Sequence, residues 1–285
     1  MRRRAAAALA SLLAAALLAA CGAQPPGGAA GGRAAFDESA FAALWAEAEA
    51  GGLDYQLGGA YEPDRGVTVV ARDREATPAG VVIDVCYVNG FQTQPGELAE
   101  WEAEHPELLL RDAAGEPVVD PAWPDERILD TSTAERREAI AEVVGTWIDG
   151  CADAGYEAVE LDNLDTWTRA EGLTQEGNLA LAALLVDRAH AAGLAAAQKN
   201  ALEAGEAGPA AGFDLVVTEE CAAFDECAAY SALHERHLAV EYDSALPVGE
   251  TFADVCARED QPVLTVLRDI DLAVPGDPAH VVERC

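Results

Sequence analysis

Residues 155–165 read Gly-Tyr-Glu-Ala-Val-Glu-Leu-Asp-Asn-Leu-Asp, and this stretch indicates the fold class. The apolar run Ala158–Leu161 breaks off into Asp162-Asn163-Leu164-Asp165, the pattern of a buried strand that carries acids at its C-terminal end. In parallel α/β proteins, reactive side chains collect at the C-terminal ends of strands. The alternative is that these acids only cap the next segment or bond within a turn. A second stretch of the same design, Phe213–Cys221, favours the catalytic interpretation.

Similar apolar runs recur along the chain with helical patterns between them. Most are continuous rather than alternating, as expected for strands that are covered on both faces. Eight such runs are present: Leu53–Leu57, Val67–Ala71, Val81–Val85, Ala158–Leu161, Leu194–Gln198, Leu215–Thr218, Leu238–Glu241 and Val263–Leu267. Eight strands alternating with helices over residues 36–285 predict an α/β fold, a single (β/α)8 TIM barrel. A doubly wound open sheet is the alternative, but it usually has fewer strands.

Two of the intervening helices are especially clear. Residues 133–154 carry one apolar stripe behind a capping box formed by Ser132 and Glu135, and residues 174–192 form a helix that Gly193 ends. A longer excursion, residues 97–130, follows the third strand with a hairpin-like segment and two tryptophans, Trp101 and Trp123. Insertions after a barrel strand lie on the active-site face.

The N-terminal segment predicts export. Arg2–Arg4 precede an apolar run, Ala5–Ala20, which is too short to span a membrane as a helix. Leu18-Ala19-Ala20-Cys21 resembles a bacterial lipobox, so residues 1–20 would form a lipoprotein signal peptide, with Cys21 lipidated and residues 21–35 a flexible tether. The alternative is an ordinary cleaved signal with a chance cysteine. The protein is therefore expected either to be held on the outer face of the cytoplasmic membrane by its lipid anchor or to be secreted.

The other six cysteines predict up to three disulfides, for which fifteen pairings exist. The six-residue separation of Cys221 and Cys227 favours a local bridge. Cys256–Cys285 would then tie down the C-terminus, and Cys86–Cys151 follows by elimination. No CxxC or histidine spacing suggests a metal, so neither metal nor cofactor is expected.

The formal net charge is −33. Such a charge repels nucleic acid and anionic lipid and attracts cations, although solubility alone would also explain it. We therefore expect the protein to bind a cationic partner and no nucleic acid. We also expect a monomer that contacts the membrane only through its lipid anchor.

Polar residues follow the apolar runs and form a predicted ring. They are Tyr55 and Gln56, Asp73, Tyr87, Asp162 with Asn163 and Asp165, Lys199 with Asn200, Glu219 with Glu220, and Glu241 with Tyr242. Acids, amides and tyrosines suit sugar hydroxyls and a hydrolysis by two carboxylates. Lys199 is the only lysine in the chain, and its ammonium could hold a carboxylate ionised or serve only as a structural ion pair.

Five motifs in order carry a family resemblance: Asp54-Tyr-Gln-Leu-Gly-Gly59, Val159-Glu-Leu-Asp-Asn-Leu-Asp165, Gln198-Lys-Asn200, Glu219-Glu-Cys221 with Glu226-Cys227, and Val240-Glu-Tyr242. Together, from about residue 41 to residue 285, the chain resembles glycoside hydrolase family 114, the endo-α-1,4-polygalactosaminidase family. The resemblance implies a (β/α)8 barrel that cleaves an α-1,4-linked, galactosamine-rich polymer. The paired acids of that family would match Asp162 and Glu219. Residues 83–90 match its pattern only loosely.

The leading hypothesis is a glycoside hydrolase that cleaves internal linkages of a cationic galactosamine-rich polysaccharide. Asp162 is expected to act as nucleophile or base and Glu219 as general acid, with Asp165 and Glu220 mattering less. The other ring residues would bind substrate, and Tyr55, Trp123 and Trp167 are candidate stacking platforms for sugars, although both tryptophans could belong to the core. The alternatives are a non-catalytic carbohydrate-binding lipoprotein on the same barrel and a two-lobed solute-binding lipoprotein.

Overall fold

A computed structural model describes residues 34–285 of the chain. The expected signal peptide, the lipidated Cys21 and nearly all of the tether lie outside these residues, so they stay predictions. No helix within residues 34–285 combines the length and the apolar character needed to span a membrane.

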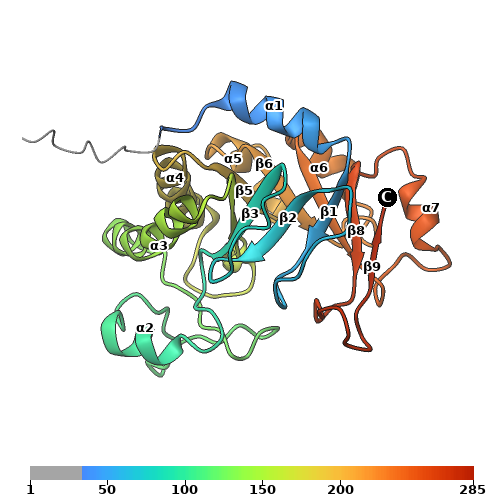
Figure 1. Cartoon of the computed structure of the whole chain (residues 1–285). Helices are drawn as coiled ribbons and strands as arrows, with labels where there is room; N and C mark the ends of the chain where they lie inside the picture. The colour runs from blue at the N-terminus through green and yellow to red at the C-terminus, as the bar shows by residue number, and fades with distance from the viewer. Residues whose placement is uncertain (1–33) are drawn as a thin grey trace, which may run out of the picture. The chain divides into compact units, whose positions relative to one another are not determined.

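Nine strands form one sheet in which each strand is hydrogen-bonded to the next along the chain (Figure 1). The first eight are parallel: β1 Gly52–Tyr55, β2 Val67–Asp73, β3 Ile83–Asn89, β4 Ala158–Asp162, β5 Ala195–Lys199, β6 Leu215–Glu219, β7 His237–Tyr242 and β8 Leu264–Arg268. This is the expected (β/α)8 barrel, rather than the two lobes of a solute-binding protein.

A ninth strand, β9 (Val282–Arg284), departs from the expected eight. It pairs with β8 in the antiparallel sense. From β9, the guanidinium of Arg284 donates to the carbonyl oxygen of Leu53 in β1 over 3.0 Å. The side chain thus joins the two ends of the nearly closed sheet. Three residues with no apolar run give too weak a pattern for a strand to be predicted from sequence.

The helices lie between the strands (Figure 1). Their bounds, with two 3₁₀ turns, are α1 Glu38–Ala48, α2 Leu98–Glu104, α3 Ala134–Ala154, η1 Thr166–Thr168, α4 Gln175–Ala191, η2 Leu202–Ala204, α5 Ala207–Ala210, α6 Cys227–Leu233 and α7 Phe252–Cys256. The capping residue predicted for α3 was wrong by one position. Thr133 is the N-cap and accepts a bond from the Arg136 amide (3.3 Å), whereas the Ser132 hydroxyl donates to Asp130.

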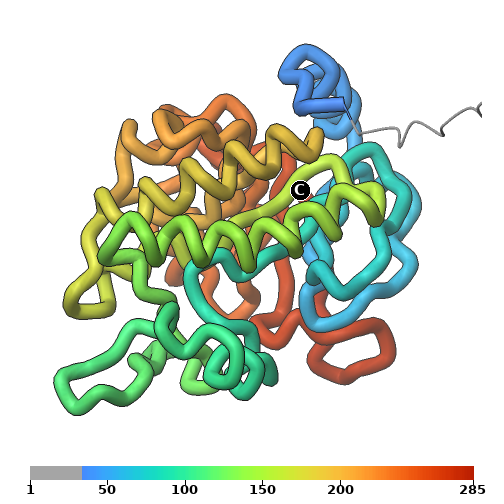
Figure 2. The backbone as a smooth tube through the Cα atoms, turned by 90° about the vertical axis from the view of Figure 1, so that its left-hand side faces the viewer, coloured from blue at the N-terminus to red at the C-terminus, as the bar shows by residue number. Residues whose placement is uncertain are grey.

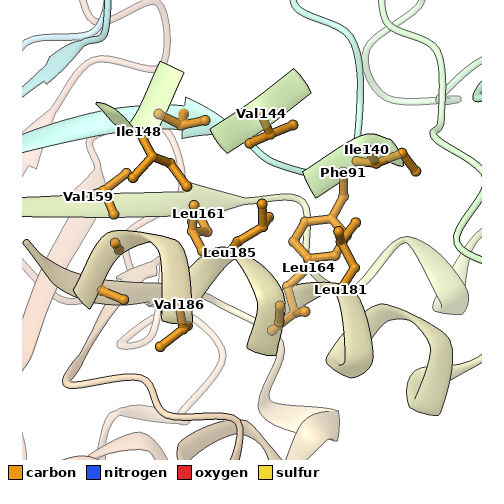
Figure 3. Packing of buried hydrophobic residues seen from close by; sticks show 14 of the residues in the cluster. Phe91, Ile140, Val144, Ile148, Val159, Leu161, Leu164, Leu181, Leu185 and Val186 are labelled. Atoms are coloured by element: carbon orange, nitrogen blue, oxygen red, sulfur yellow. The ribbon is translucent and has the colours of Figure 1, made fainter. Parts of the chain in front are cut away.

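Alternation along the strands divides their side chains between two cores. Every second residue points into the barrel, where Leu53, Val69, Val85, Val217 and Val240 belong to one buried cluster. The intervening residues point outward against the helices. Figure 3 shows Val159 and Leu161 of β4 packed among side chains of α3 and α4. Both faces of the sheet are therefore covered, which explains the continuous apolar runs.

The third strand is longer than expected. It runs to Asn89 instead of ending at Val85, so Tyr87 and Asn89 belong to the strand rather than to the loop after it. Tyr87 keeps the inward direction of Val85, because both lie on the same side of the alternation.

The excursion after β3 contains α2 and a set of short antiparallel bridges, among them Arg111 with Pro117 and Val119 with Arg127. The expected hairpin is thus present as isolated bridges. Both views place this excursion at the same end of the barrel as the C-terminal loop before β9, with α1 at the opposite end (Figures 1 and 2).

Three disulfides join Cys86 to Cys151, Cys221 to Cys227 and Cys256 to Cys285. These are the pairs that the sequence analysis favours. The first fixes β3 to α3, the second closes the loop between β6 and α6, and the third ties the C-terminus to α7.

Candidate active site

Two carboxylates flank one ammonium at the C-terminal end of the barrel. Asp162 ends β4, Lys199 ends β5 and Glu219 ends β6. The Lys199 Nζ lies 3.6 Å from Oδ1 of Asp162 and 3.3 Å from Oε2 of Glu219. Each acid is the last residue of its strand rather than one residue beyond it, so the pleat itself aims both side chains inward.

A tyrosine hydroxyl donates to each acid. Tyr87 of β3 donates to Oδ2 of Asp162 over 2.7 Å, and Tyr242 of β7 donates to Oε1 of Glu219. Burial raises the pKa of Tyr87 and Tyr242 well above the usual range, and the adjacent carboxylates raise it further. Both phenols therefore remain protonated donors at neutral pH. The five residues form an array on the neighbouring strands β3–β7.

The floor of this array is a buried ion pair. Glu160, two residues before Asp162, lies 3.0 Å from the Lys199 ammonium through Oε1, and the same oxygen accepts a bond from the Tyr55 hydroxyl (2.7 Å). Burial alone would lower the pKa of Lys199, but the carboxylates of Asp162 and Glu219 outweigh it and hold that pKa well above its usual value. Lys199 therefore stays charged beneath the two acids.

The residue after each of these three strand ends has a left-handed backbone. Asn163, Asn200 and Glu220 have φ of 66°, 44° and 60°. Asparagine tolerates this region, whereas glutamate adopts it at a cost of about 1–2 kcal/mol. The left-handed residue turns the backbone away from the strand direction directly after Asp162, Lys199 and Glu219. Backbone strain of this kind is concentrated at functional sites.

These side chains line a cavity of about 700 Å³. From the strand ends come Asp73, Tyr87, Asp162, Asn163, Asp165, Lys199, Asn200, Glu219, Glu220 and Tyr242. From the loops come Leu57, Gly58, Gln94, Pro95, Asp120, Ala122, Trp123, Glu126, Arg169, Ile270, Asp271 and Leu272. The excursion after β3 thus contributes one wall, as its position in the sequence predicts.

A model of glycoside-hydrolase family GH114 matches residues 35–285. The chain belongs to this family. It is therefore a glycoside hydrolase. Among curated protein sequences, none matches it.

Solved structures that share the fold of this GH114 chain include two that match it over most of its length. One is Ega3 of Aspergillus fumigatus in a complex with galactosamine, with a TM-score of 0.65 and 19% identity over 84% of this chain and 96% of that one. The other is the glycoside hydrolase domain of PelA from Pseudomonas aeruginosa, with a TM-score of 0.56 and 16% identity over 81% of this chain and 97% of that one.

Some of the expected site residues of this GH114 barrel do not line the cavity. Tyr55 lies beneath Lys199 and is 1% exposed, so its ring cannot stack on a sugar. Gln56 is buried beside Arg72, whose Nε donates to its side-chain oxygen. Glu241 points outward from the barrel and accepts a bond from the Ala222 amide (3.0 Å). Trp167 packs against two apolar clusters, whereas Trp123 lines the cavity and is 55% exposed.

The alternation of β7 explains the position of Glu241. Val240 and Tyr242 point into the barrel, so the residue between them must point outward. Glu241 lies among Cys221, Cys227 and their neighbours, where its carboxylate and the two sulfurs come within 4.8 Å of one another. The sulfurs are joined as a disulfide and are not thiolate ligands. Glu241 therefore supports the loop after β6.

Sequence reasoning missed the cavity residues that the excursion supplies. Asp120 is fully buried and pairs with Arg169 over 2.6 Å, and Arg169 also bonds Asp165 and Asn163. Glu126 receives a bond from the side chain of Asn89 (2.9 Å). Asp120, Glu126 and Arg169 do not follow any of the eight predicted strands, so a search confined to the ends of those strands could not find them.

Proposed function

We propose that this GH114 enzyme hydrolyses internal α-1,4 linkages of a galactosamine-rich polysaccharide with Asp162 and Glu219 as its pair of carboxylates. The observation that carries the proposal is that both acids face one cavity and both contact the ammonium of Lys199. Each of them also accepts a hydrogen bond from a tyrosine hydroxyl. Two opposed carboxyl groups are what glycoside hydrolysis requires.

The surroundings of the two acids support different roles. Both acids accept from a tyrosine and contact Lys199, but Asp162 also accepts a 2.8 Å bond from the amide of Asn163, whereas the third donor of Glu219 is the side chain of Asn200 at 3.4 Å. The stronger set of donors stabilises the negative charge of Asp162 as nucleophile or base. Glu219 has the more exposed side chain, 29% against 19%, so it is the more accessible to the leaving glycosidic oxygen, to which it would give a proton. Asn200 accepts from the Glu219 amide over 2.8 Å and thereby holds the end of β6.

The charge of the cavity supports a cationic substrate. Eight of the residues that line it carry carboxyl groups, and only Lys199 and Arg169 carry positive charge. Lys199 is engaged by the catalytic pair, and Arg169 by Asp120 and Asp165. A polymer with free amino groups would compensate the remaining negative charge. Ega3, which shares the fold, forms a complex with galactosamine.

Variants that keep side-chain shape test this proposal. Asp162→Asn and Glu219→Gln should each lower kcat on polygalactosamine about a hundredfold or more, because each removes an acid–base or nucleophilic group. Glu220→Gln is the matched control, since Glu220 lines the same cavity but is not part of the Lys199 cluster, and it should retain most activity. The proposal fails if neither Asp162→Asn nor Glu219→Gln reduces the release of oligosaccharides.

We further propose that the chain is exported and anchored through a lipidated Cys21. The three disulfides of the barrel suit an oxidising compartment outside the cytoplasm. Cys21→Ser should prevent lipidation and release or misprocess the protein, as measured by membrane fractionation and by mass spectrometry of the N-terminus. Normal processing and membrane retention of Cys21→Ser would contradict it.

A further inference from the structure

Glu126 is a buried acid in the wall that the excursion after β3 adds to the cavity. It is 6% exposed and lines the cavity. Its Oε2 accepts a bond from Nδ2 of Asn89, a fully buried residue at the end of β3. Its amide donates to the carbonyl oxygen of Trp123 over 2.9 Å. One tight turn therefore carries a buried carboxyl and an exposed indole on the same wall.

Glu126 differs from Asp120, the other buried acid that lines this cavity, in having no counter-ion. Asp120 is paired with Arg169, and the half-buried Asp162 and Glu219 share Lys199. Within residues 34–285, no Lys, Arg or His nitrogen lies within ion-pair distance of Glu126, and Oε1 has no hydrogen-bond partner there. A buried carboxylate without a cation is costly unless a ligand supplies the charge.

A chain of side-chain contacts connects Glu126 to the catalytic acid. The Oδ1 of Asn89 accepts from Nδ2 of Asn163 (3.0 Å), and the amide of Asn163 donates to Oδ1 of Asp162 (2.8 Å). Glu126 thus lies on the Asp162 side of the cavity.

We propose that Glu126 is the subsite for the ammonium group of an amino sugar bound beside Asp162, with Trp123 as the neighbouring platform for the sugar ring. The inference rests on the proposed function and deepens it, because it makes Glu126 the residue that selects free amine over N-acetyl. A neutral, bulkier acetamido group cannot supply the missing positive charge. Trp123 offers an apolar face next to this charge.

The electrostatics of the site agree with this assignment. The pKa of Glu126 is raised to about 7, chiefly by burial and also by the charges of Asp162 on β4 and Asp120 in the excursion. The bond from Asn89 and the charge of Arg169, which follows η1, act in the opposite direction. Tyr87 of β3 is the other titratable group on this side, and it remains protonated. An incoming ammonium favours the ionised form of Glu126, so binding below pH 7 should release a proton.

Titration calorimetry at pH 6 tests the subsite in a Glu219→Gln background, where hydrolysis is slow. The ligands are an α-1,4-linked galactosamine tetramer and its fully N-acetylated counterpart. At pH 6, a carboxyl with a pKa of about 7 is about nine-tenths protonated. Titrations in two buffers of different ionisation enthalpy should therefore show nearly one proton released per galactosamine tetramer bound.

Two variants define the source of that proton. Adding Glu126→Gln should abolish the release and weaken the Kd for the galactosamine tetramer about tenfold to a hundredfold. The Kd for the N-acetylated tetramer should change less than about threefold, within the range of a surface change. Asp125→Asn is the matched control, because it removes an exposed acid from the same turn and should alter neither quantity.

The outcomes separate this inference from the proposed function. Binding without proton release overturns the subsite, and this measurement needs no Glu126 variant. Equal weakening of both tetramers by Glu126→Gln also overturns it, because that result indicates a structural role. A different result would refute the proposed hydrolysis and not the subsite. In that case the galactosamine tetramer binds in a Glu126-dependent way, but the protein with intact Glu219 does not hydrolyse it. Absence of any tetramer binding refutes both.

Discussion

The ammonium of Lys199 lies 3.0 Å from Oε1 of Glu160, and the side chains of both residues are at most 2% exposed. This ion pair lies one layer beneath Asp162 and Glu219, because Glu160 and Asp162 occupy successive inward positions of β4. The second oxygen of Glu160 is buried and has no hydrogen-bond partner within residues 34–285. Lys199 is therefore both the partner of a buried charge and the cation between Asp162 and Glu219.

Removal of Lys199 should separate these two roles. Lys199→Met leaves Glu160 as an uncompensated buried carboxylate, so the free energy of unfolding should fall by about 3–5 kcal/mol. Adding Glu160→Gln should restore about 2 kcal/mol or more, because the buried charge is gone. Activity should stay at least about a hundredfold below that of the unmodified enzyme in both variants. Urea unfolding and initial rates measure the two effects, and recovery of activity in the double variant would contradict the second role.

The hydroxyls of Tyr87 and Tyr242 should matter for turnover more than for folding. Tyr87→Phe deletes a hydrogen bond to the carboxylate of Asp162, and Tyr242→Phe deletes one to the carboxylate of Glu219. Bonds to charged groups contribute about 1.5–3 kcal/mol, so kcat should fall about tenfold to a hundredfold. Tyr230→Phe is the control, since its hydroxyl accepts from the Leu202 amide outside the cavity. Equal losses of kcat in all three variants would show that the phenols act only through stability.

The two candidate stacking tryptophans should respond differently to truncation. Trp123 is exposed on the cavity wall, so Trp123→Ala should raise KM about tenfold with little change in stability. Trp167 packs against apolar clusters, so Trp167→Ala should lower the free energy of unfolding by about 3 kcal/mol. Kinetics and urea unfolding on both variants check this division. The same KM for Trp123→Ala and the unmodified enzyme would remove Trp123 from the substrate site.

Glu241 should make stability depend on pH. Burial raises its folded pKa to about 7, above the usual value of a glutamate. The folded chain therefore binds the proton more tightly, so this group destabilises the fold once the pH rises above its usual pKa, with the full effect above pH 7. Glu241→Gln should stabilise the protein at pH 8 by on the order of 2 kcal/mol and have little effect at pH 4.5. Thermal or urea unfolding at the two pH values, with exposed Glu235→Gln as control, checks this; a pH-independent difference would contradict it.

The barrel and its central acids could be predicted from local pattern. Apolar runs of strand length between amphipathic helices predict a parallel sheet that is buried on both faces, and this prediction does not depend on the conformation of the loops. Asp162, Lys199 and Glu219 belong to the predicted polar ring because the carboxyl ends of parallel strands converge at one edge, so residues that end different strands become neighbours. The family resemblance, rather than the local pattern, singled out Asp162 and Glu219 as the pair. Of the disulfides, Cys221–Cys227 was predicted from its six-residue separation, Cys256–Cys285 as a tie for the C-terminus, and Cys86–Cys151 by elimination.

Only the tertiary structure decided which polar residues face the cavity and which lie outside it. Tyr55 points inward but is covered by Lys199, and Glu241 points outward because its neighbours in β7 occupy the barrel interior. Glu126, Asp120 and Arg169 come together because an excursion folds back over the strand ends, and the contacts that fix it join residues far apart in sequence. The local sequence determined the sheet because alternation and hydrophobic burial act over a few residues. The charge balance of the cavity depended on tertiary folding, because Lys199 meets Asp162 and Glu219, and Arg169 meets Asp120, only where segments far apart in the sequence come together.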